Sequence, residues 1–293
     1  MKHLNLLCVL LTFILSGRAA GEVMSPEEQR NLISMYQYVT GQIDRLPASV
    51  STGWADEERP IKCGTPVILE FWDNYGNFDP ALLAATPLSQ VIRPILPDSF
   101  DTPGGNIRVH FAVAGDDAVY QAGVDSDGDG VPDFVESVGR IADSVYDYTI
   151  NVLGYPPPLV DTLCDNGGDE RVDIYLVELG GSVFGQTWAD TLCAQGPSYQ
   201  HSPGWVEIDN DYQEPGFGSY VSRPLDAVRV TLAHEFFHTI HFSLDRKESR
   251  ALYEMSAVWM EEEQYDHIND YYIWLPVFYN HPRVSLQSEN API

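Results

Sequence analysis

The sequence predicts an α+β fold, and three observations support that class. Segments with strand and helix patterns alternate after Asn106, two consecutive segments near the C-terminal end have helical spacing, and no internal repeat is evident. The 293-residue chain is 44% hydrophobic, which is ordinary for a folded protein and excludes a disordered acidic tail. We expect a sheet packed against helices, preceded by an irregular N-terminal segment.

Residues 1–19 form a predicted secretory signal. Lys2 gives a positive start, residues 4–15 are an apolar stretch, and Gly17 and Ala19 place small residues at −3 and −1 of a cleavage site. That stretch is too short to span a bilayer, and no later segment qualifies as a transmembrane helix. We therefore expect a secreted protein, in the extracellular space, at the cell surface or in a periplasm.

Residues 20–104 form a predicted N-terminal segment. An amphipathic helix is expected at residues 25–43, beginning with Ser-Pro-Glu-Glu. Residues 45–105 are rich in proline and irregular, with one strand-like run at residues 67–72. The sequence leaves open whether this segment is a propeptide or a layer packed on the rest of the chain.

Residues 105–293 carry the alternating pattern. We expect strands at residues 107–113, 171–177 and 204–208, and helices at residues 134–152, 225–243 and 251–260. No Gly or Pro interrupts the 225–243 helix, and Pro224 suits its first turn, where a missing N–H costs nothing. Because the sequence stops at Ile293 directly after an aromatic-rich segment, we expect this domain to be truncated.

The 225–243 helix contains the pattern His234-Glu235-Phe-Phe-His238. Residues i and i+4 lie on one helix face, so both imidazoles can bind one metal ion. Glu235, one step round the helix, is left beside the open coordination position, where it can take a proton from the bound water. The pattern predicts a Zn²⁺ site with Glu235 as general base. The alternative is a core helix whose histidines are only hydrogen-bonded.

The next helical segment supplies a candidate third ligand. Glu254 is the one charged residue among residues 251–260, and a carboxylate is costly to bury unless it is paired or bound to metal. Glu261 lies two turns further along the same face and could hydrogen-bond a ligating histidine. His241 is about 10 Å along the axis from His234. We therefore expect His241 to line the groove or pack, outside the metal's reach.

These two helices resemble those of the gluzincin metallopeptidases, which include thermolysin and the zinc aminopeptidases. In the aminopeptidase branch the third ligand is a Glu followed by a small residue at +3, an aromatic at +5 and an acid at +7. The four matching residues here are Glu254, Ala257, Trp259 and Glu261. The region 63–282 is also similar to poorly characterised secreted bacterial metalloproteases that carry H-E-F-F-H.

The resemblance implies a zincin-like domain, with a twisted sheet over the active-site helix, and a protein or peptide substrate. In that family an edge strand beside the cleft binds the substrate main chain. Residues 204–209 are our candidate for this strand, and an ordinary interior strand is the equal alternative. Gluzincins also place an oxyanion-stabilising His or Tyr downstream, for which the sequence offers His267, Tyr271, Tyr272 and His281.

The chain departs from the gluzincin pattern in two ways. Only fifteen residues separate His238 from Glu254, which is shorter than the usual interval, so the connecting turn must be tight. The Gly-rich G-x-M-E-N stretch of the aminopeptidases is absent before the zinc helix. The resemblance therefore favours an endopeptidase.

A second metal motif occupies residues 125–136. It matches the twelve-residue calcium loop at every ligand position, with Gly130 at the sharp turn. The predicted Ca²⁺ ligands are Asp125, Asp127, Asp129, the Val131 carbonyl, Asp133 and Glu136. Pro132 and the absence of a preceding helical pattern argue against a paired signalling module. We expect one structural calcium site, and the alternative is a solvated acidic turn.

The net charge limits the kinds of binding partner, and the cysteine content suggests one disulfide. With 43 acidic against 16 basic residues the net charge is −27, which argues against nucleic acid and anionic membranes as partners. In an oxidising compartment Cys164 and Cys193 are the favoured disulfide. Cys63 is then left unpaired, or its partner lies beyond Ile293. The sequence leaves the oligomeric state open.

Two functions compete. The first is a secreted zinc endopeptidase in which His234, His238 and Glu254 bind zinc and Glu261 supports a ligand. The second is a non-catalytic surface or adhesion module that is stabilised by its metals. An intact Glu235 favours the enzyme, since a purely structural zinc site has no need of that acid.

Overall fold

The computed structural model describes residues 24–43, 45–47, 50, 61–86, 93–161, 167–180, 183–190, 200–273, 275 and 279. Its helices are α1 Pro26–Val39, α2 Thr65–Asp73, α3 Pro80–Ala85, α4 Asp133–Tyr146, α5 Pro224–Asp245 and α6 Arg250–Tyr265. Its strands are β1 Ile61–Cys63, β2 Asp98–Asp101, β3 Ile107–Phe111, β4 Val172–Val177, β5 Val183–Ala189 and β6 Gly204–Asp209. The predicted signal and the Cys164–Cys193 pair lie outside the described residues.

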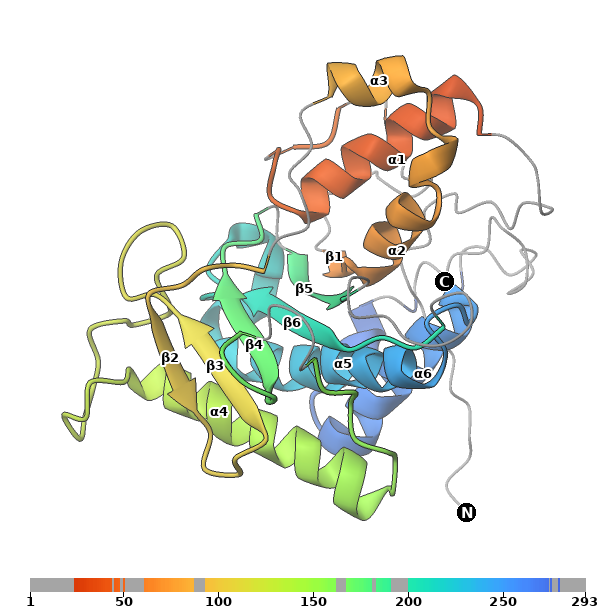
Figure 1. Cartoon of the computed structure of the whole chain (residues 1–293). Coiled ribbons are helices and arrows are strands. Elements are labelled where there is room, and N and C mark those ends of the chain that lie inside the picture. Colours follow the sequence, from red (N-terminus) through yellow and green to blue (C-terminus); the bar gives the residue numbers. More distant parts are fainter. Residues whose placement is uncertain are drawn as a thin grey trace.

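The six strands form one mixed sheet in the order β1-β5-β6-β4-β3-β2 (Figure 1). Strands β3, β4 and β6 run parallel, whereas β5 is antiparallel to β6 and β2 is antiparallel to β3. The short strand β1 pairs with β5 in parallel and forms one edge of the sheet. The α+β class predicted from the sequence is therefore confirmed.

Helices cover both faces of the sheet (Figure 1). On β4, Ile174 and Leu176 belong to the core shared with α4 and α5, whereas Tyr175 and Val177 belong to the core shared with α1 and α2. This division follows from the alternation of side chains along a strand. The N-terminal residues thus form a layer that packs against the sheet, on the face opposite α5.

Most predicted elements agree with the structure. The expected helix at residues 25–43 is α1, which begins with a capping box between Ser25 and Glu28. The expected helix at residues 134–152 corresponds to α4 and the π-helical turn Asp147–Val152 that follows it. The expected strands at residues 107–113, 171–177 and 204–208 correspond to β3, β4 and β6.

One strand prediction is wrong, and the structure decides between two alternatives that the sequence left open for another strand. Residues 67–72 are part of helix α2, which starts after Gly64 with Pro66 in its first turn. A short apolar run cannot distinguish a buried strand from a buried helix, and this run is buried on nearly every side. Strand β6, our candidate edge strand, is interior, because β5 separates it from the edge. The sequence analysis had missed β5, whose residues are buried throughout.

Among the helices of the described residues, none combines the length and apolar character that crossing a bilayer requires.

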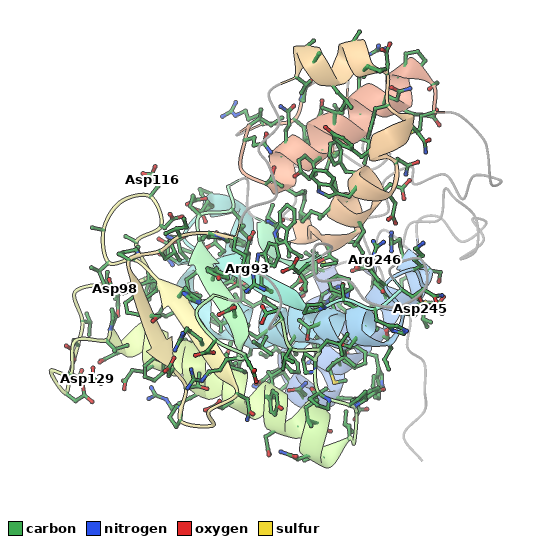
Figure 2. All side chains as sticks on the ribbon, in the orientation of Figure 1. Arg93, Asp98, Asp116, Asp129, Asp245 and Arg246 are labelled. Atoms are coloured by element: carbon green, nitrogen blue, oxygen red, sulfur yellow. The ribbon has the colours of Figure 1, made fainter. Side chains whose placement is uncertain are left out.

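Buried Arg93 ties the chain before β2 to the sheet (Figure 2). Its guanidinium pairs with Asp161 and Asp173 and lies 4.8 Å from the centre of the Trp205 ring. We expect Arg93→Met to lower the free energy of unfolding by about 3–5 kcal/mol, because it leaves buried carboxylates without their cation. Urea unfolding measures this loss.

The matched control is Arg140→Met, since Arg140 is exposed and pairs with Glu136 along α4 at 3.7 Å. That variant should change the free energy of unfolding by no more than about 0.5 kcal/mol. Equal losses in the two variants would contradict the role assigned to the buried pairs.

Candidate metal centre

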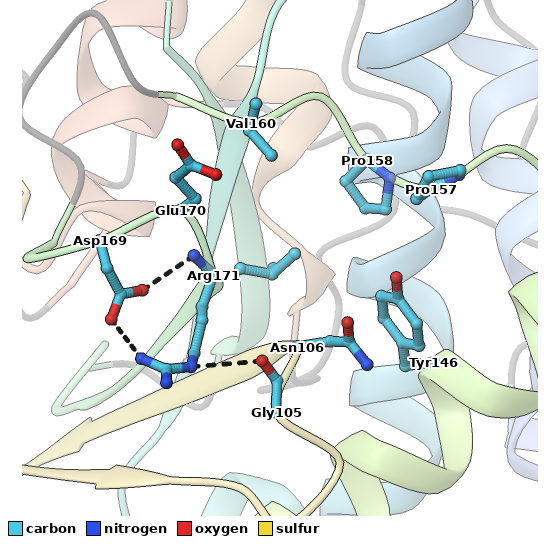
Figure 3. A pocket seen from close by; sticks show the side chains of 10 residues that line it. Gly105, Asn106, Tyr146, Pro157, Pro158, Val160, Asp169, Glu170 and Arg171 are labelled. Carbon is cyan, nitrogen blue, oxygen red and sulfur yellow. Dashed lines mark hydrogen bonds and ion pairs between the residues drawn. The ribbon is translucent and has the colours of Figure 1, made fainter.

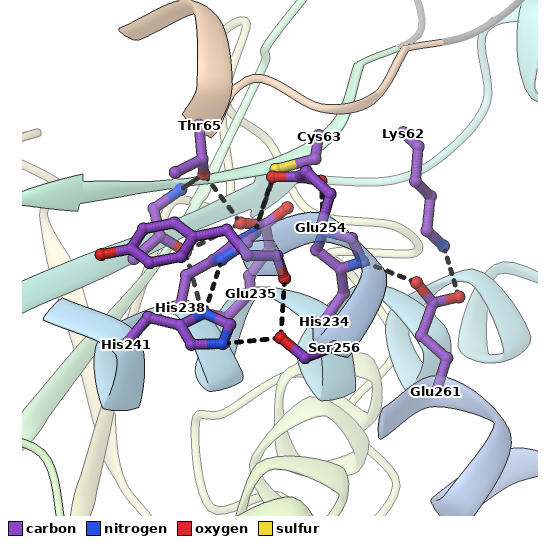
Figure 4. Close-up of polar contacts among 12 residues, drawn as sticks. Lys62, Cys63, Thr65, His234, Glu235, His238, His241, Glu254, Ser256 and Glu261 are labelled. Carbon is purple, nitrogen blue, oxygen red and sulfur yellow. Dashed lines mark hydrogen bonds and ion pairs between the residues drawn. The ribbon is translucent and has the colours of Figure 1, made fainter. Parts of the chain in front are cut away.

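Helices α5 and α6 bring the three predicted zinc ligands together (Figure 4). Glu254 Oε2 lies 3.2 Å from His234 Nε2, and Glu254 Oε1 lies 3.3 Å from His238 Nε2. Both histidines are fully buried and Glu254 is 3% exposed. The i, i+4 spacing on α5 and the position of Glu254 in the first half of α6 produce this convergence.

The separations between these atoms fit one tetrahedral ion. Zinc bonds of about 2.0 Å to nitrogen or oxygen and about 2.3 Å to sulfur, at tetrahedral angles, hold neighbouring ligand atoms about 3.3–3.5 Å apart. The observed distances of 3.2 and 3.3 Å, each to a different oxygen of Glu254, are close to that range. The donor set of two imidazoles and a carboxylate also suits zinc. The residues therefore fit the metal that the sequence predicts.

A fourth potential metal ligand, which was not predicted from the sequence, lies next to these three residues. Cys63, at the end of β1, places its Sγ 3.5 Å from His238 Nε2. One ligand atom from each of Cys63, His234, His238 and Glu254 lies within 4.8 Å of the others. Cys63 is 5% exposed and makes no disulfide. Since the cysteine is 171 residues from His234, no local pattern could have revealed this contact.

Glu235 lies beside this group and is fully buried. Its Oε2 accepts hydrogen bonds from Thr187 Oγ1 at 2.8 Å and from Thr65 Oγ1 at 3.2 Å. Its Oε1 has no hydrogen-bond partner among the described residues. One carboxylate oxygen is thus held by two threonines while the other remains able to accept a proton.

The outward ring nitrogen of His234 binds Glu261, as predicted for a supporting residue. The distance from Nδ1 to Glu261 Oε1 is 2.7 Å. Glu261 also pairs with buried Lys62 at 3.2 Å, and Lys62 pairs with Asp270 at 2.7 Å. A carboxylate at Nδ1 fixes the tautomer that leaves Nε2 free for a metal.

His241 has a comparable contact with His238. Their Nδ1 atoms are 3.2 Å apart, and His241 Nε2 lies 2.9 Å from Ser256 Oγ, which itself donates to the Leu252 carbonyl. Burial and nearby His238 hold the pKa of His241 well below its usual value, so its ring is neutral. It can therefore accept the His238 N–H and donate to Ser256. His241 packs as expected, and in addition it orients His238.

We expect His241→Ala to weaken zinc binding by about 10–100-fold, because His238 loses the acceptor that holds its ring. Competition with a chromogenic chelator measures this change. His201→Ala is the control, since His201 contacts the Ser243 carbonyl at 3.0 Å. Unchanged affinity in His241→Ala, or equal weakening in both variants, would contradict the orienting role.

Without a metal ion, burial and the neighbouring charges shift the pKa values of the ligands in different directions. Burial lowers the pKa of His234, but hydrogen bonds with Glu254 and Glu261 outweigh it and raise that pKa to about 10. Burial raises the pKa of Glu254, but His238 and His234 outweigh it and lower that pKa to about 2. Burial, Glu235 and Glu254 raise the pKa of the Cys63 thiol. A bound cation would have to displace protons from His234 and Cys63.

The predicted calcium loop is exposed and lies before α4, with Asp129 on its outer part (Figure 2). Carboxylate oxygens of Asp125, Asp127 and Asp129 come within 4.8 Å of one another. Asp125 accepts from the backbone N–H groups of Gly128 and Gly130 at 2.7 and 3.0 Å, and both glycines have positive φ.

The remaining predicted calcium ligands have other contacts in the structure. The Asp133 carboxylate accepts from Ser126, whose N–H and Oγ lie at 2.8 and 2.5 Å. Glu136 pairs with Arg140, and the Val131 N–H donates to Asp129 at 2.9 Å. Of the five predicted carboxylate ligands, the structure therefore brings three within 4.8 Å of one another.

The downstream candidates for oxyanion stabilisation are only partly described. Tyr271 and Tyr272 pack against each other, with ring centres 4.6 Å apart, and His267 packs near Tyr265. His281 lies outside the described residues.

A separate surface pocket of about 540 Å³ lies at the start of β4 (Figure 3). Arg171 crosses one side of it, pairing with Asp169 and donating to the Gly105 carbonyl at 3.3 Å. Its lining contains no histidine or cysteine.

Comparison with known protein families, with curated proteins and with solved structures finds no match for this chain. The function is therefore argued from the geometry of the metal group alone.

Proposed function

We propose that this protein is an exported zinc-dependent peptidase, with endopeptidase activity favoured. The observation that carries the proposal is the buried convergence of His234, His238 and Glu254, whose ligand atoms lie within 4.8 Å of one another, with Glu235 beside them. The distances match those of a single zinc ion, and the neighbouring acid has one unpartnered oxygen among the described residues. These two features together support hydrolysis more than a structural metal alone.

Each residue has a defined task in peptide hydrolysis. Zinc, when bound, lowers the pKa of a water and stabilises negative charge on the substrate carbonyl oxygen. Glu235 accepts the proton of the attacking water and returns it to the leaving amine. Thr187 holds one oxygen of that carboxylate, which leaves the other to take the proton. Glu261 and His241 fix the rings of the two histidines.

The arrangement around the metal group supports a zincin-like fold. Helix α5 carries the H-E-x-x-H pattern and packs against the sheet, and α6 packs on α5 to supply Glu254. Strand β5 lies next to Glu235 through Thr187, so β5 takes the place that we had assigned to residues 204–209 as the strand beside the cleft.

The test is cleavage of casein by zinc-loaded protein. Hydrolysis should stop when a chelator removes the metal and return when zinc is restored. Both the wild type and Cys63→Ala are assayed, so that activity is still detected if the thiol near the metal inhibits the wild type. Absence of chelator-sensitive cleavage in both zinc-loaded proteins would contradict the proposal.

A second candidate function is a metal-stabilised module without catalysis. It is favoured by Cys63, since four protein donors around zinc are typical of structural sites. Under this alternative, removing Cys63 should weaken zinc binding and stability without producing peptidase activity. The casein assay on Cys63→Ala therefore separates the two candidates.

The loop of Asp125, Asp127 and Asp129 supports a structural calcium site in the same protein. Three carboxylates within 4.8 Å repel one another unless a cation lies between them. Millimolar calcium should raise the melting temperature of the wild type, and Asp129→Ala should reduce that rise without changing zinc content. Equal rises in the two proteins would show that the loop is a solvated turn.

A further inference from the structure

We propose that residues 61–65 hold this peptidase in a latent state, with Cys63 as the fourth zinc ligand and the following residues on the edge of β5. The inference rests on the proposed function. Residues 61–65 lie within the stretch 45–105, which the sequence predicts to be irregular. Three separate contacts of this segment support it.

The first contact is at the metal. A catalytic zinc site keeps one coordination position for water or substrate, whereas four protein ligands close it. Cys63 Sγ lies 3.5 Å from His238 Nε2, the separation of about 3.5 Å expected for sulfur and nitrogen on one tetrahedral zinc. The thiolate would therefore occupy the position that water needs.

The second contact is at the sheet edge. The Gly64 N–H donates to the Gly185 carbonyl at 2.9 Å, and the Thr187 N–H donates to Thr65 Oγ1 at 2.7 Å. Ile61 and Cys63 pair in register with Val183 and Gly185. Segment 61–65 thus satisfies the backbone groups of β5 that an extended peptide substrate would use for strand addition.

The third contact is at the general base. Thr65 Oγ1 donates to Glu235 Oε2 at 3.2 Å. The four metal-binding side chains are between 0% and 5% exposed, and Glu235 and Thr65 are fully buried. While this segment is in place, it restricts the access of substrate to the base and the metal. The same five residues therefore cover the metal, the binding edge and the base.

Release of the segment requires more than a local fluctuation. Lys62, on the same strand, pairs with both Glu261 and Asp270 in a buried setting. Separating such pairs leaves uncompensated charges and is strongly unfavourable. We therefore expect full activity to require cleavage or displacement of the N-terminal layer, whereas loss of the Cys63 thiolate alone opens the water position and gives a partial gain. Once β1 has left, β5 becomes the free edge of the sheet.

The metal contact is tested by replacing zinc with cobalt(II) in the full chain. Wild-type protein should show a sulfur-to-cobalt charge-transfer band, which Cys63→Ala should lose while its visible cobalt bands remain. Glu235→Gln is the control and should keep the charge-transfer band. Absence of this band in the wild type, or its persistence in Cys63→Ala, would overturn the ligand assignment even if the protein is an active peptidase.

The latent state is tested by casein hydrolysis at equal zinc content. Cys63→Ala should retain zinc through its three other ligands and cleave casein severalfold faster than the wild type. Unchanged or lower activity in zinc-loaded Cys63→Ala would overturn latency. A cobalt–thiolate band with no peptidase activity in either protein would instead refute the proposed function, and latency with it.

Thr65→Val provides a second variant, in case loss of Cys63 impairs folding. It removes the hydroxyl that contacts β5 and Glu235 but keeps the thiol near the metal. Its casein hydrolysis should also rise, because a segment held less firmly at β5 and Glu235 leaves the metal more often, while the resting protein keeps the charge-transfer band. A rate no higher than that of the wild type would count against blocking of the edge.

The structure also assigns a second calcium site, at the carboxyl ends of β4 and β6. Glu178 follows β4, Asp209 ends β6, and Glu214 precedes the 3₁₀ helix Pro215–Ser222. One carboxylate oxygen of each lies within 4.8 Å of the other two. Calcium–oxygen bonds of about 2.3–2.6 Å allow ligand oxygens to be up to about 5 Å apart.

This group contains buried oxygens that have no hydrogen-bond partner among the described residues. Asp209 is 1% exposed, and its Oδ1 accepts from the N–H groups of Asp211 and Tyr212 at 3.1 and 2.5 Å. Asp209 Oδ2 and Glu214 Oε2 are buried and have no hydrogen-bond partner among the described residues. Burying unpaired carboxylates is costly, and a hard divalent cation with oxygen ligands removes the cost.

The test uses an Asp129→Ala background, which disables the exposed loop site. Saturating calcium should still raise the melting temperature, by roughly 5 °C at a hundredfold excess over the dissociation constant. Adding Asp209→Asn should abolish this residual shift and raise the melting temperature in calcium-free buffer, because a buried unpaired charge is removed. No residual shift, or a shift that survives Asp209→Asn, would overturn the site, and an equal shift with magnesium would overturn its assignment to calcium.

Discussion

Glu235→Gln should lower the rate of peptide hydrolysis by about 10²–10⁴-fold, the usual contribution of a positioned general base. The amide has nearly the same shape as the carboxylate but cannot accept the proton of the attacking water. Thr187 Oγ1, which lies 2.8 Å from Glu235 Oε2, can still donate to the amide oxygen. The fold and the three ligands are therefore expected to remain.

The measurement is the initial rate of casein cleavage at equal zinc content, in the wild-type and Cys63→Ala backgrounds. Glu263→Gln is the matched control, because Glu263 is an exposed acid on α6, and its rate should equal that of the parent. Full activity in Glu235→Gln would show that another group acts as the base.

Glu254→Ala should cause the largest loss of zinc affinity among the acidic residues of α6. Its two oxygens lie 3.2 and 3.3 Å from the two histidine Nε2 atoms, so its removal deletes a ligand. Glu261→Ala removes only the partner of His234 Nδ1, a contact worth about 10–100-fold in affinity. Zinc titration of the two metal-free variants, with Glu263→Ala as control, gives the order.

The opposite order would contradict the ligand set. If Glu261→Ala loses zinc while Glu254→Ala keeps it, the third ligand lies two helical turns from the residue that we assign. Circular dichroism of each metal-free variant shows whether a loss of zinc reflects a ligand or a loss of fold.

Local spacing explains what the sequence could predict. The i, i+4 histidines and the acid between them define the metal-binding face of α5, and the apolar setting of Glu254 marks a carboxylate that needs a partner. The role of Glu261 follows from its position two helical turns after Glu254, on the same face of α6. These residues lie on two consecutive helices, so their convergence needs only a tight turn between the helices.

The remainder of the site depends on contacts between distant segments. Cys63 and Thr65 reach α5 only because the three-residue strand β1 pairs with β5. Such a short strand has no periodicity to recognise, and β5 itself contains Gly185 in a run without clear alternation. The sequence features that could have indicated this contact were Cys63, which had no assigned disulfide partner, and the Gly-Thr-Pro sequence at the start of α2.

The prediction of the fold was also limited to local features of the sequence. The long helices α1, α4 and α5 were predicted as helices, and the predicted ends of α5 agree with the structure within two residues. The apolar run at residues 67–72 was misassigned because six residues are too few for their periodicity to separate a buried strand from a buried helix. The position of β6 in the sheet required knowledge of β5, since pairing order is a property of the whole chain.

The most direct test of the account is the zinc content of the folded protein, prepared without chelators and compared with His238→Ala. Elemental analysis should find one zinc per wild-type chain and almost none in the variant after dialysis, because His238 supplies one of the two imidazoles. Folded wild-type protein that carries no zinc and takes up none on titration would contradict the zinc peptidase proposed here.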